Sequence, residues 1–466
     1  MHIHEIAPSL CQEVFPADPD FPQLKIASDP RRMLELFRAH LKPISGKPYH
    51  IRECLPFRFR FRQRGTRCVL QYTLRLVEPG EGREHSQSVT GFIHAKDGES
   101  ERHWRELQVT DPRQGIPEHL LTFEPSGFIP DLKMLLTLFP YDRKLQSLPR
   151  VMAGPWGDLG QRLLARFGPG DWNMEQCNIE AARYRAELGA VVRYTVSVRK
   201  GSRAGDESKR FYLKVYTEQR GETSGQLLRV LSEGTDHRGF SVVRPVTYDS
   251  ESRTLVMEEA PGVSLQEAFL RGCDPVAASV KIARAVAAFN QSDIGATQLY
   301  SLENKRSQLE RATTLLRWAC PQLRPALDQV TAAVIAGLDE APVAPIHRDL
   351  KPDHIFLDGD RVTFVDLDSL ALADPVIDPA HLMSHLVARV GLSSVTLEQA
   401  RAAAAAFSEE YFAHVPRAWR LRLPAHYAAA LVEVAAGIFK RQEAQWPEKV
   451  AATLEEAQNA LSEGFP

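Results

Sequence analysis

The chain has 466 residues, 44% of them hydrophobic and 25% charged, and its formal net charge is −2. This length indicates two or three domains, and the composition is that of an ordinary globular protein with enough apolar material for a full core. The near-neutral charge excludes a general attraction to nucleic acid or to acidic membranes and leaves room only for local basic patches.

Cysteine usage and the N-terminal sequence indicate a cytoplasmic protein. Six cysteines lie at positions 11, 54, 68, 177, 273 and 320, and none forms a CxxC pair, which suits reduced thiols. The N-terminus lacks the basic start and apolar run of a signal peptide. The most apolar later stretch, 426–439, contains Glu433 and is too short to cross a bilayer. We therefore expect a buried helix there and no membrane partner.

Residues 50–100 show the patterns of β-strands. The segment 57–65, "FRFRFRQRG", alternates aromatic and basic residues, as a half-solvated strand does. Two further strand-like runs follow at 67–77 and 88–95, with a Pro-Gly turn and polar residues between them. This region is therefore predicted to form antiparallel strands.

A second β-rich region resembles the first. The stretch 182–198 matches 59–76 in order and spacing: both contain an Arg–aromatic–Arg step, a glycine and an apolar run that reaches Tyr-Thr. In each region a polar loop then leads to another apolar strand, and Phe92 falls near the place of Lys214. We interpret the pair as a duplicated unit, with two unrelated hairpins of similar composition as the alternative.

From about residue 262 the pattern becomes helical, with apolar residues three or four apart. Within this part, 354–359 and 362–369 predict two short strands joined by a tight Asp-Gly-Asp turn. We therefore predict an α+β protein with a bilobed, protein-kinase-like fold behind a smaller β-rich domain. The expected parts are a cap domain that resembles a degenerate N-lobe at 1–165, an antiparallel β N-lobe at 170–261 and a helical C-lobe at 262–466.

Lys214 stands in the middle of an apolar strand, "FYLKVY", where a cation needs a partner. Nucleotide phosphates and a glutamate of the following helix would supply one, and an exposed strand lysine is the alternative. Glu222 is our candidate for that glutamate, and Glu218 is its rival. A solvated glutamate that favours the helix dipole would explain Glu222 equally well.

The segment 254–265, "TLVMEEAPGVSL", has the features of a hinge between two lobes. An apolar strand ends here, and a Pro-Gly pair breaks the chain before a helix. We therefore predict that the backbone of Glu258 and Ala260 bonds the edge of an adenine ring.

The segment 346–357, "IHRDLKPDHIFL", concentrates the polar side chains that can do chemistry. Asp349 is placed to accept a hydrogen bond from an acceptor hydroxyl and to align it for in-line attack. Lys351 can offset the charge of a moving phosphoryl group. Asp366 ends the next apolar run, where a carboxylate at a strand tip can hold Mg²⁺. Asp378 is interpreted as a structural acid that bonds the loop from beneath.

Taken together, the segments "HRDLKPDHIFL", "FVDLD", "ADPVIDPAHL", "FYLKVY" and "LVMEEAPG" resemble the aminoglycoside phosphotransferase family, which includes choline and homoserine kinase relatives. The resemblance covers about residues 170–440. It implies a protein-kinase-like fold and transfer of the ATP γ-phosphate, with Mg²⁺, to a hydroxyl of a small molecule. It also implies that Asp349 is the catalytic acid/base residue and that Asp366 binds the metal.

Two positions depart from the family pattern. Arg348 stands where the family has glycine, and His354 stands where it has an asparagine that binds a metal ion and steadies the catalytic aspartate. Imidazole can ligate a metal or bond Asp349, but Mg²⁺ prefers oxygen ligands. We therefore expect either a weakened second metal site at His354 or catalysis with one Mg²⁺. Asp368 is a possible second ligand or simply a loop acid.

The predicted function is an ATP- and Mg²⁺-dependent phosphotransferase that acts on a small metabolite such as a sugar or an amino alcohol. A protein kinase is excluded because only seven residues separate Asp366 from Asp374, too few for a segment that seats a peptide. The alternative is a pseudokinase that senses nucleotide or acts as a scaffold, motivated by His354 and the additional β unit. His381 and His385 have the spacing of a metal pair, but we interpret them as packing histidines.

Overall fold

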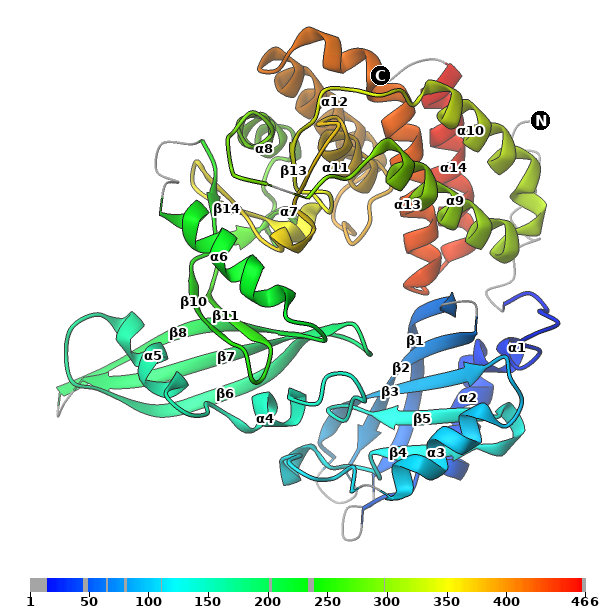
Figure 1. The fold of residues 1–466 in the computed structure, drawn as a ribbon, viewed down its shortest axis with the longest axis vertical. Coiled ribbons are helices and arrows are strands. Elements are labelled where there is room, and N and C mark those ends of the chain that lie inside the picture. Colours follow the sequence, from blue (N-terminus) through cyan, green and yellow to red (C-terminus); the bar gives the residue numbers. More distant parts are fainter. Residues whose placement is uncertain are drawn as a thin grey trace.

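The computed structural model describes residues 15–44, 49–63, 66–78, 82–109, 111–200, 203–233, 239–296 and 298–462. Two five-stranded antiparallel sheets and a helical lobe make up most of this part of the chain (Figure 1). This mixed architecture confirms the predicted fold class, a bilobed kinase-like fold preceded by a β-rich region. The residue boundaries expected for the three parts remain predictions.

The N-terminal sheet has the strand order β1-β2-β3-β5-β4, and all neighbouring strands are antiparallel. Helices α1 and α2 pack on one face and α3 packs on the other. Asp29 caps α2 by accepting from two backbone N–H groups of its first turn, and Pro30 stands at the first helical position. The elements are β1 (His50–Gln63), β2 (Arg67–Val77), β3 (Glu84–His94), β4 (Ser126–Ile129), β5 (Met134–Leu138), α1 (Leu24–Ala27), α2 (Pro30–His40) and α3 (Glu99–Val109).

The second sheet has the order β6-β7-β8-β11-β10 and is also antiparallel throughout. Burial alternates along β7, so Val192, Tyr194 and Val196 share the buried face, as the period of a strand requires. This face packs against α4 and α5. The elements are β6 (Trp172–Arg185), β7 (Gly189–Lys200), β8 (Arg203–Tyr216), β10 (Pro245–Asp249), β11 (Thr254–Glu258), α4 (Leu148–Ala153), α5 (Leu159–Leu164) and α6 (Arg220–Ser232).

The two sheets follow the same path through space. In each, three consecutive strands are followed by a helix and then by a hairpin whose second strand returns to the third strand of the sheet. The register agrees as well, because Val69 pairs with Phe92 in the first sheet and Val191 pairs with Lys214 in the second. A duplicated unit would produce this arrangement, with Phe92 at the place of Lys214. The duplication itself remains a hypothesis.

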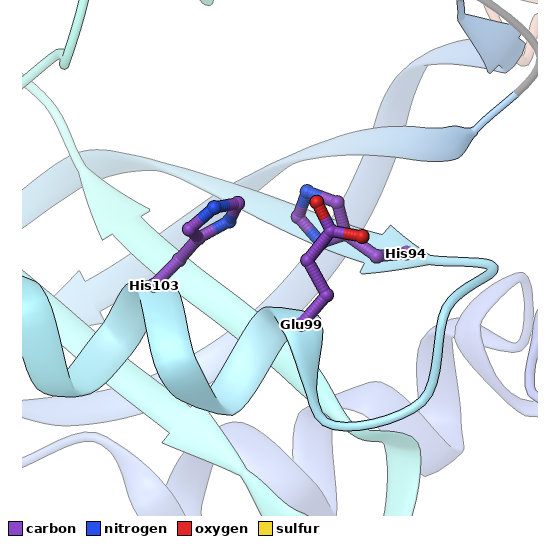
Figure 2. Close-up of side chains that lie close together, drawn as sticks. All are labelled: His94, Glu99 and His103. Atoms are coloured by element: carbon purple, nitrogen blue, oxygen red, sulfur yellow. The ribbon is translucent and has the colours of Figure 1, made fainter.

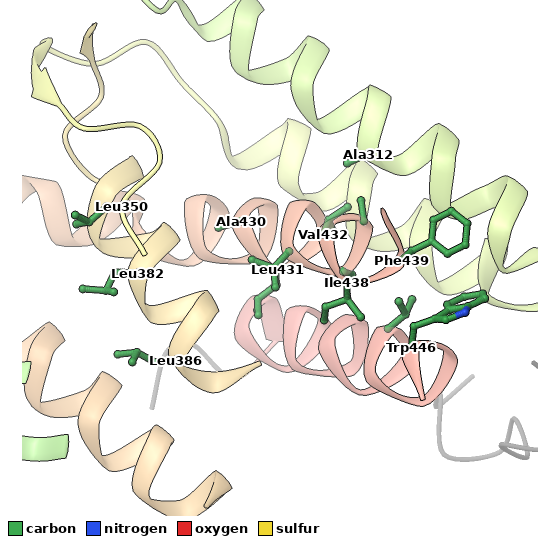
Figure 3. Close-up of a cluster of buried hydrophobic side chains, with 14 of the residues drawn as sticks. Ala312, Leu350, Leu382, Leu386, Ala430, Leu431, Val432, Ile438, Phe439 and Trp446 are labelled. Atoms are coloured by element: carbon green, nitrogen blue, oxygen red, sulfur yellow. The ribbon is translucent and has the colours of Figure 1, made fainter. Parts of the chain in front are cut away.

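The helical lobe is built around α13 (Leu423–Lys440), which is buried against α9, α11 and α14 (Figure 3). Small side chains let the neighbouring helices approach closely, since residues 428–430 are alanines and are fully buried. The buried helix expected at 426–439 is thus confirmed. Among the described residues, no helix is both long and apolar enough to cross a membrane. The other helices are α7 (Leu265–Leu270), α8 (Pro275–Asn290), α9 (Leu302–Ala319), α10 (Arg324–Gly337), α11 (Ile377–Val387), α12 (Leu397–Ala413) and α14 (Trp446–Ser462).

A small sheet carries the polar segments that the sequence singled out. Strands β14 (Ile355–Asp358) and β15 (Arg361–Phe364) form the expected antiparallel hairpin, and Gly359 adopts φ 59° in its turn, a conformation that favours glycine. A second, two-stranded ladder joins β13 (Ala344–Ile346) to β16 (Ala371–Ala373) and was not foreseen. The loop between β13 and β14 is therefore held at both ends by short ladders.

The N-terminal sheet contacts the turn between β6 and β7 in the second sheet. Arg60 of β1 donates from Nη2 to the Ala186 carbonyl at 2.8 Å. Asp142, buried in the segment after β5, accepts from the Tyr184 hydroxyl at 2.8 Å and from the Glu187 N–H at 2.7 Å. These bonds fix the two sheets side by side, as Figure 1 shows.

The same N-terminal part also contacts the helical lobe. Phe61 stacks on Trp318 of α9 with ring centroids 4.1 Å apart, and the Trp318 indole N–H donates to Asp18 at 3.0 Å. Phe59 packs edge-on against Phe439 of α13. The N-terminal part therefore bridges the second sheet and the helical lobe.

Candidate functional site

The loop after β13 is anchored from beneath by Asp378 of α11. Its fully buried carboxylate accepts from the backbone N–H groups of His347 at 2.7 Å and Arg348 at 2.8 Å, and from the Asn290 amide at 3.0 Å. The structural role expected for Asp378 is thus confirmed. Arg348 adopts φ 67°, so this loop turns sharply just before Asp349.

Asp349, Lys351 and His354 lie together at the end of this loop. Lys351 donates from Nζ to the Asp349 carboxylate at 2.9 Å. The His354 Nδ1 lies 2.9 Å from the Asp349 backbone carbonyl and 3.6 Å from its carboxylate, so the ring holds the backbone of Asp349 in place. His354 is only 3% exposed, which leaves its Nε2 as the nitrogen that faces the neighbouring acids.

Asp366 follows β15 and faces the same space as His354. Its backbone adopts φ 62°, a left-handed conformation that is uncommon outside glycine and is enriched at functional sites. A carboxylate oxygen of Asp366 lies 3.4 Å from His354 Nε2. Asp349, His354 and Asp366 each offer one ligand atom, and these atoms lie within 4.8 Å of one another. The sequence prediction that these three side chains belong together agrees with this geometry.

Lys214 of β8 bonds to two aspartates rather than to a glutamate. Its Nζ forms an ion pair with Asp366 and another with Asp368 at 2.8 Å. Glu222 lies exposed in the first turn of α6, and Glu218 is exposed before it. In the described structure neither glutamate pairs with Lys214, because the ammonium group reaches across to the helical lobe instead. The expected pairing is therefore corrected to Asp366 and Asp368.

The connection between the lobes begins at Glu258, the last residue of β11. The Glu258 N–H donates to the Arg244 carbonyl at 2.9 Å, so this N–H is not free to donate to an adenine edge. Ala260 is buried and lines the same cavity as Glu258. Gly262 adopts φ 80°, and a Cβ there would come within 1.9 Å of the Leu357 carbonyl oxygen, so the chain passes β14 more closely than any other residue type allows.

A small cavity of about 220 Å³ opens between the second sheet and the β14–β15 hairpin. Its roof carries Val191, Lys214 and Leu255, and its floor carries Phe356 and Asp366. The lining is apolar near the hinge and ionic at the other end. This gradient suits a ligand with a flat apolar ring and an anionic tail.

A large cavity of about 1170 Å³ lies on the other side of the loop, between β1, β6 and the helical lobe. Asp349 and Lys351 line it, whereas His354 and Asp366 line the small cavity. Asp353 borders both. The two cavities therefore meet at the loop.

Opposing effects set the charges of these groups. Burial raises the pKa of Asp349, but Lys351 and His354 outweigh it and hold this pKa below its usual value. Burial lowers the pKa of His354 to about 4, and Lys351 adds to the effect. Burial also lowers the pKa of Lys214, but its aspartate partners raise this pKa by more than burial lowers it, so the net shift is upward. Near pH 7 the site thus contains ionised carboxylates, an ammonium group and a neutral imidazole.

Asp368 completes the group around Lys214, and Tyr216 donates from its hydroxyl to Asp368 at 3.0 Å. The sequence analysis did not single out Tyr216, since a tyrosine at a strand end has no distinctive pattern. His381 Nδ1 lies 2.8 Å from the Leu350 carbonyl, and His385 is buried with Nδ1 3.0 Å from the His381 carbonyl. Both line the large cavity, and their interpretation as packing histidines remains a prediction.

A second group of nitrogen and oxygen ligands lies in the N-terminal sheet, where His94, Glu99 and His103 converge (Figure 2). Two of the imidazole nitrogens already have partners: His94 Nδ1 lies 2.9 Å from Ser100 Oγ, and His103 Nε2 lies 2.9 Å from Arg102 Nη2. Nearby cations also act on both rings, including Arg143. Because this positive surrounding opposes a divalent ion, we assign no metal to the group.

The described structure has a kinase-like architecture, with two cavities that meet at the loop carrying Asp349. Residues 195–421 match the model of the phosphotransferase enzyme family. This match covers just under half of the chain and supports phosphotransferase activity.

Among solved structures, the chain is similar to a thermostable mutant of an aminoglycoside phosphotransferase in ternary complex with AMP-PNP and hygromycin B. The two share 13% identity over 66% of this chain and 99% of that one, with a TM-score of 0.42. It is also similar to a choline/ethanolamine kinase family protein from Mesorhizobium loti, with 14% identity, 62% and 92% coverage and a TM-score of 0.40. An ethanolamine kinase of Plasmodium vivax shows 11% identity, 59% and 81% coverage and a TM-score of 0.39. No curated protein matches the chain.

Proposed function

We propose that this protein transfers the γ-phosphate of ATP, in the presence of Mg²⁺, to a hydroxyl group of a small metabolite. The observation that carries the proposal is the position of the loop between two cavities. Asp366 and Lys214 line the small cavity, and Asp349 and Lys351 line the large one. A nucleotide in the first and an acceptor in the second would meet at the loop.

Each residue of the two cavities would have a role that follows from its position. The Glu258 carbonyl and the Ala260 backbone would bind the adenine edge, and Lys214 would bind phosphate oxygens. Asp349 would accept a hydrogen bond from the acceptor hydroxyl and orient it for in-line attack. Lys351, 2.9 Å from Asp349, would offset the charge of the moving phosphoryl group. Glu222 has no contact in this site and stays a prediction as a nucleotide-binding residue.

The donor set fits a magnesium ion at Asp366. Mg²⁺ favours carboxylate oxygens, and Asp366 and Asp368 present carboxylates to the small cavity. Lys214 pairs with both, and Arg183 lies 4.0 Å from Asp366. His354 is neutral and directs Nε2 toward Asp366, so it could serve as a weaker ligand. The ion would neutralise phosphate charge when bound.

Calorimetric titration with AMP-PNP, with and without Mg²⁺, tests the nucleotide half of the proposal. We expect Mg²⁺-dependent binding that Asp366→Ala reduces at least about tenfold, because the variant removes the charge that a metal ion requires. Asp360→Asn is a matched control, since Asp360 is exposed on the β14–β15 turn and pairs only with Lys281 in the described structure. Absence of AMP-PNP binding would favour the pseudokinase alternative.

Asp349→Asn tests the transfer half. We expect this variant to bind AMP-PNP as the parent protein does and to lose ATP-dependent phosphorylation of an acceptor found by screening hydroxylated metabolites. Full turnover by Asp349→Asn would exclude the role that we assign to Asp349.

A further inference from the structure

The large cavity has a pronounced excess of positive charge. Nine of its lining side chains are arginine or lysine, whereas four are aspartate or glutamate. The whole chain has a net charge of −2, so this excess is a local property of the cavity. The cations come from three parts of the fold: Arg58 from β1, Arg183 and Arg185 from β6, and the remainder from the helical lobe.

Three of the four acids that line the cavity are already paired with a lysine or arginine. Lys305 forms a buried ion pair with Glu433 at 2.7 Å, and Gln308 donates to the same carboxylate. Arg441 and Lys449 both pair with Glu443, at 2.8 and 3.2 Å. Lys351 pairs with Asp349. These carboxylates are therefore not free to bind a cationic ligand.

Several of the cations, in contrast, are not part of an ion pair in the described structure. Within the described ranges of the chain, no ion pair is formed by Arg58, Arg185, Arg311, Arg389 or Lys440, all of which line the cavity. Three buried guanidinium nitrogens there also have no hydrogen-bond acceptor: Arg58 Nε, Arg185 Nε and Arg441 Nη2. A buried donor without an acceptor is unfavourable, and a buried charge without a partner is more so.

The arginines also repel one another. Burial lowers the pKa of Arg58, and the charges of Arg185, Arg183 and Arg441 lower it further. Burial and Arg183 likewise lower the pKa of Arg185, and Asp349 partly compensates. Such an arrangement destabilises the free protein and becomes favourable when an oxyanion enters, because guanidinium groups bind phosphate and carboxylate in a bidentate manner.

We propose that the acceptor is an alcohol that also carries a compact oxyanion, a phosphate or a carboxylate, held by Arg58, Arg185 and Arg441 while its hydroxyl lies at Asp349. This inference rests on the proposed function for the transfer step. It assigns the acceptor to anionic metabolites. Polycationic and quaternary ammonium acceptors are excluded, because among the described residues that line the cavity Asp353 is the one carboxylate without a lysine or arginine partner.

The reaction balances without a further reactant. The acceptor oxygen attacks the γ-phosphorus and forms the new P–O bond, while the bond between the γ-phosphorus and the bridging oxygen breaks. The electron pair of that bond stays on the β-phosphate of ADP, and the hydroxyl proton passes to the Asp349 carboxylate. The products are ADP and a phosphate ester that is more anionic than the acceptor.

The proposal also gives the N-terminal sheet a role. Arg58 lies in β1, so the acceptor cavity is incomplete without that sheet. The contacts of β1 with the β6–β7 turn and with Trp318 would then position Arg58 opposite Arg185.

The test is a calorimetric titration of matched acceptors into the full-length protein saturated with Mg²⁺ and AMP-PNP. The probes are glucose 6-phosphate, gluconate and glucose, together with glycerol 3-phosphate, glycerate and glycerol. We expect at least one phosphorylated or carboxylated probe to bind at least about tenfold more tightly than its uncharged parent, and the phosphate and carboxylate arms distinguish the two oxyanions. Equal binding of all charged and uncharged probes, or binding by none of the charged ones, would overturn the proposal.

Two variants test whether Arg58 binds the oxyanion of the charged probe. Arg58→Gln should weaken binding of the charged probe at least about tenfold and leave the uncharged parent unaffected, since a charge-assisted bond is lost. Arg52→Gln is the matched control on the same strand, because Arg52 is exposed and pairs with Glu84 at 2.6 Å; it should bind as the parent protein does. Equal affinities of Arg58→Gln and Arg52→Gln would refute the site.

Thermal unfolding and nucleotide-free titrations keep the outcomes distinct. Arg58→Gln should unfold at the parent temperature or above it, because it removes an uncompensated buried charge. Arg185→Gln, on a different sheet, is a second variant that should show the same loss of oxyanion affinity.

Repeating the titrations without nucleotide separates the two proposals. Oxyanion binding without any AMP-PNP binding would remove the proposed function and leave the oxyanion site standing.

Discussion

Replacing Asp378 by asparagine tests the support of the loop that carries Asp349. All three groups that point at the Asp378 carboxylate are donors: Oδ2 accepts from the His347 N–H and the Asn290 amide, and Oδ1 accepts from the Arg348 N–H. An asparagine has one acceptor oxygen and one NH₂ group. In either orientation its NH₂ group must face at least one N–H donor.

The magnitude follows from counting these bonds. The better orientation places the asparagine oxygen at the former Oδ2 position and leaves the Arg348 N–H without an acceptor, at a cost of about 1–3 kcal/mol. The two remaining bonds lose their charge assistance, which about halves their strength. We therefore expect Asp378→Asn to lower the free energy of unfolding by about 2–4 kcal/mol.

Urea unfolding, followed by circular dichroism, measures the difference. Asp360→Asn makes the same chemical change at an exposed position and should unfold at the urea concentration of the parent protein. Nucleotide binding should survive in Asp378→Asn, while phosphate transfer falls because Asp349 is no longer held in position. A stability change in Asp378→Asn as small as that of the control would refute this account of the loop.

Two further predictions concern the ends of the small cavity. His354→Asn exchanges an imidazole for an amide oxygen beside Asp366. The Mg²⁺ concentration for half-maximal AMP-PNP binding should therefore fall by about threefold or more in calorimetry. If that Mg²⁺ concentration is unchanged or higher, the histidine is the better ligand. Gly262→Ala places a Cβ 1.9 Å from the Leu357 carbonyl oxygen at φ 80°, and we expect it to lose about 2–4 kcal/mol in urea unfolding. Gly295→Ala is the control, with φ 64° and open space around its Cβ, and should lose about 1–2 kcal/mol; equal losses would contradict the steric argument.

Local patterns predicted the parts of the fold that depend on local physics. The strand at 57–65, the tight turn between β14 and β15 and the buried α13 each follow from side chains near one another in the sequence. The anchoring of the loop by Asp378 was also inferred correctly, since an acid within an apolar helix requires donors.

Contacts between distant segments were not accessible in the same way. The sequence could not show whether Lys214 pairs with Glu222 or with Asp366, because that choice depends on how closely the second sheet approaches the helical lobe. The cationic lining of the large cavity was missed for a similar reason. The alternating arginines of 57–65 were interpreted as part of a half-solvated strand, and only the packing of three segments makes Arg58 and Arg185 neighbours.

The bridge formed by the N-terminal part has a consequence for motion. Kinase-like lobes open by rotation about the hinge, here near Glu258. In this chain the bond from Arg60 to Ala186 holds the second sheet, and the stacking of Phe61 on Trp318 holds the helical lobe, both from one rigid sheet. Rotation of one lobe must therefore break one set of these contacts or carry the sheet with it. Substrate entry and product release would then require coupled motion of three bodies: the N-terminal sheet, the second sheet and the helical lobe. The N-terminal sheet would restrain the opening of the other two.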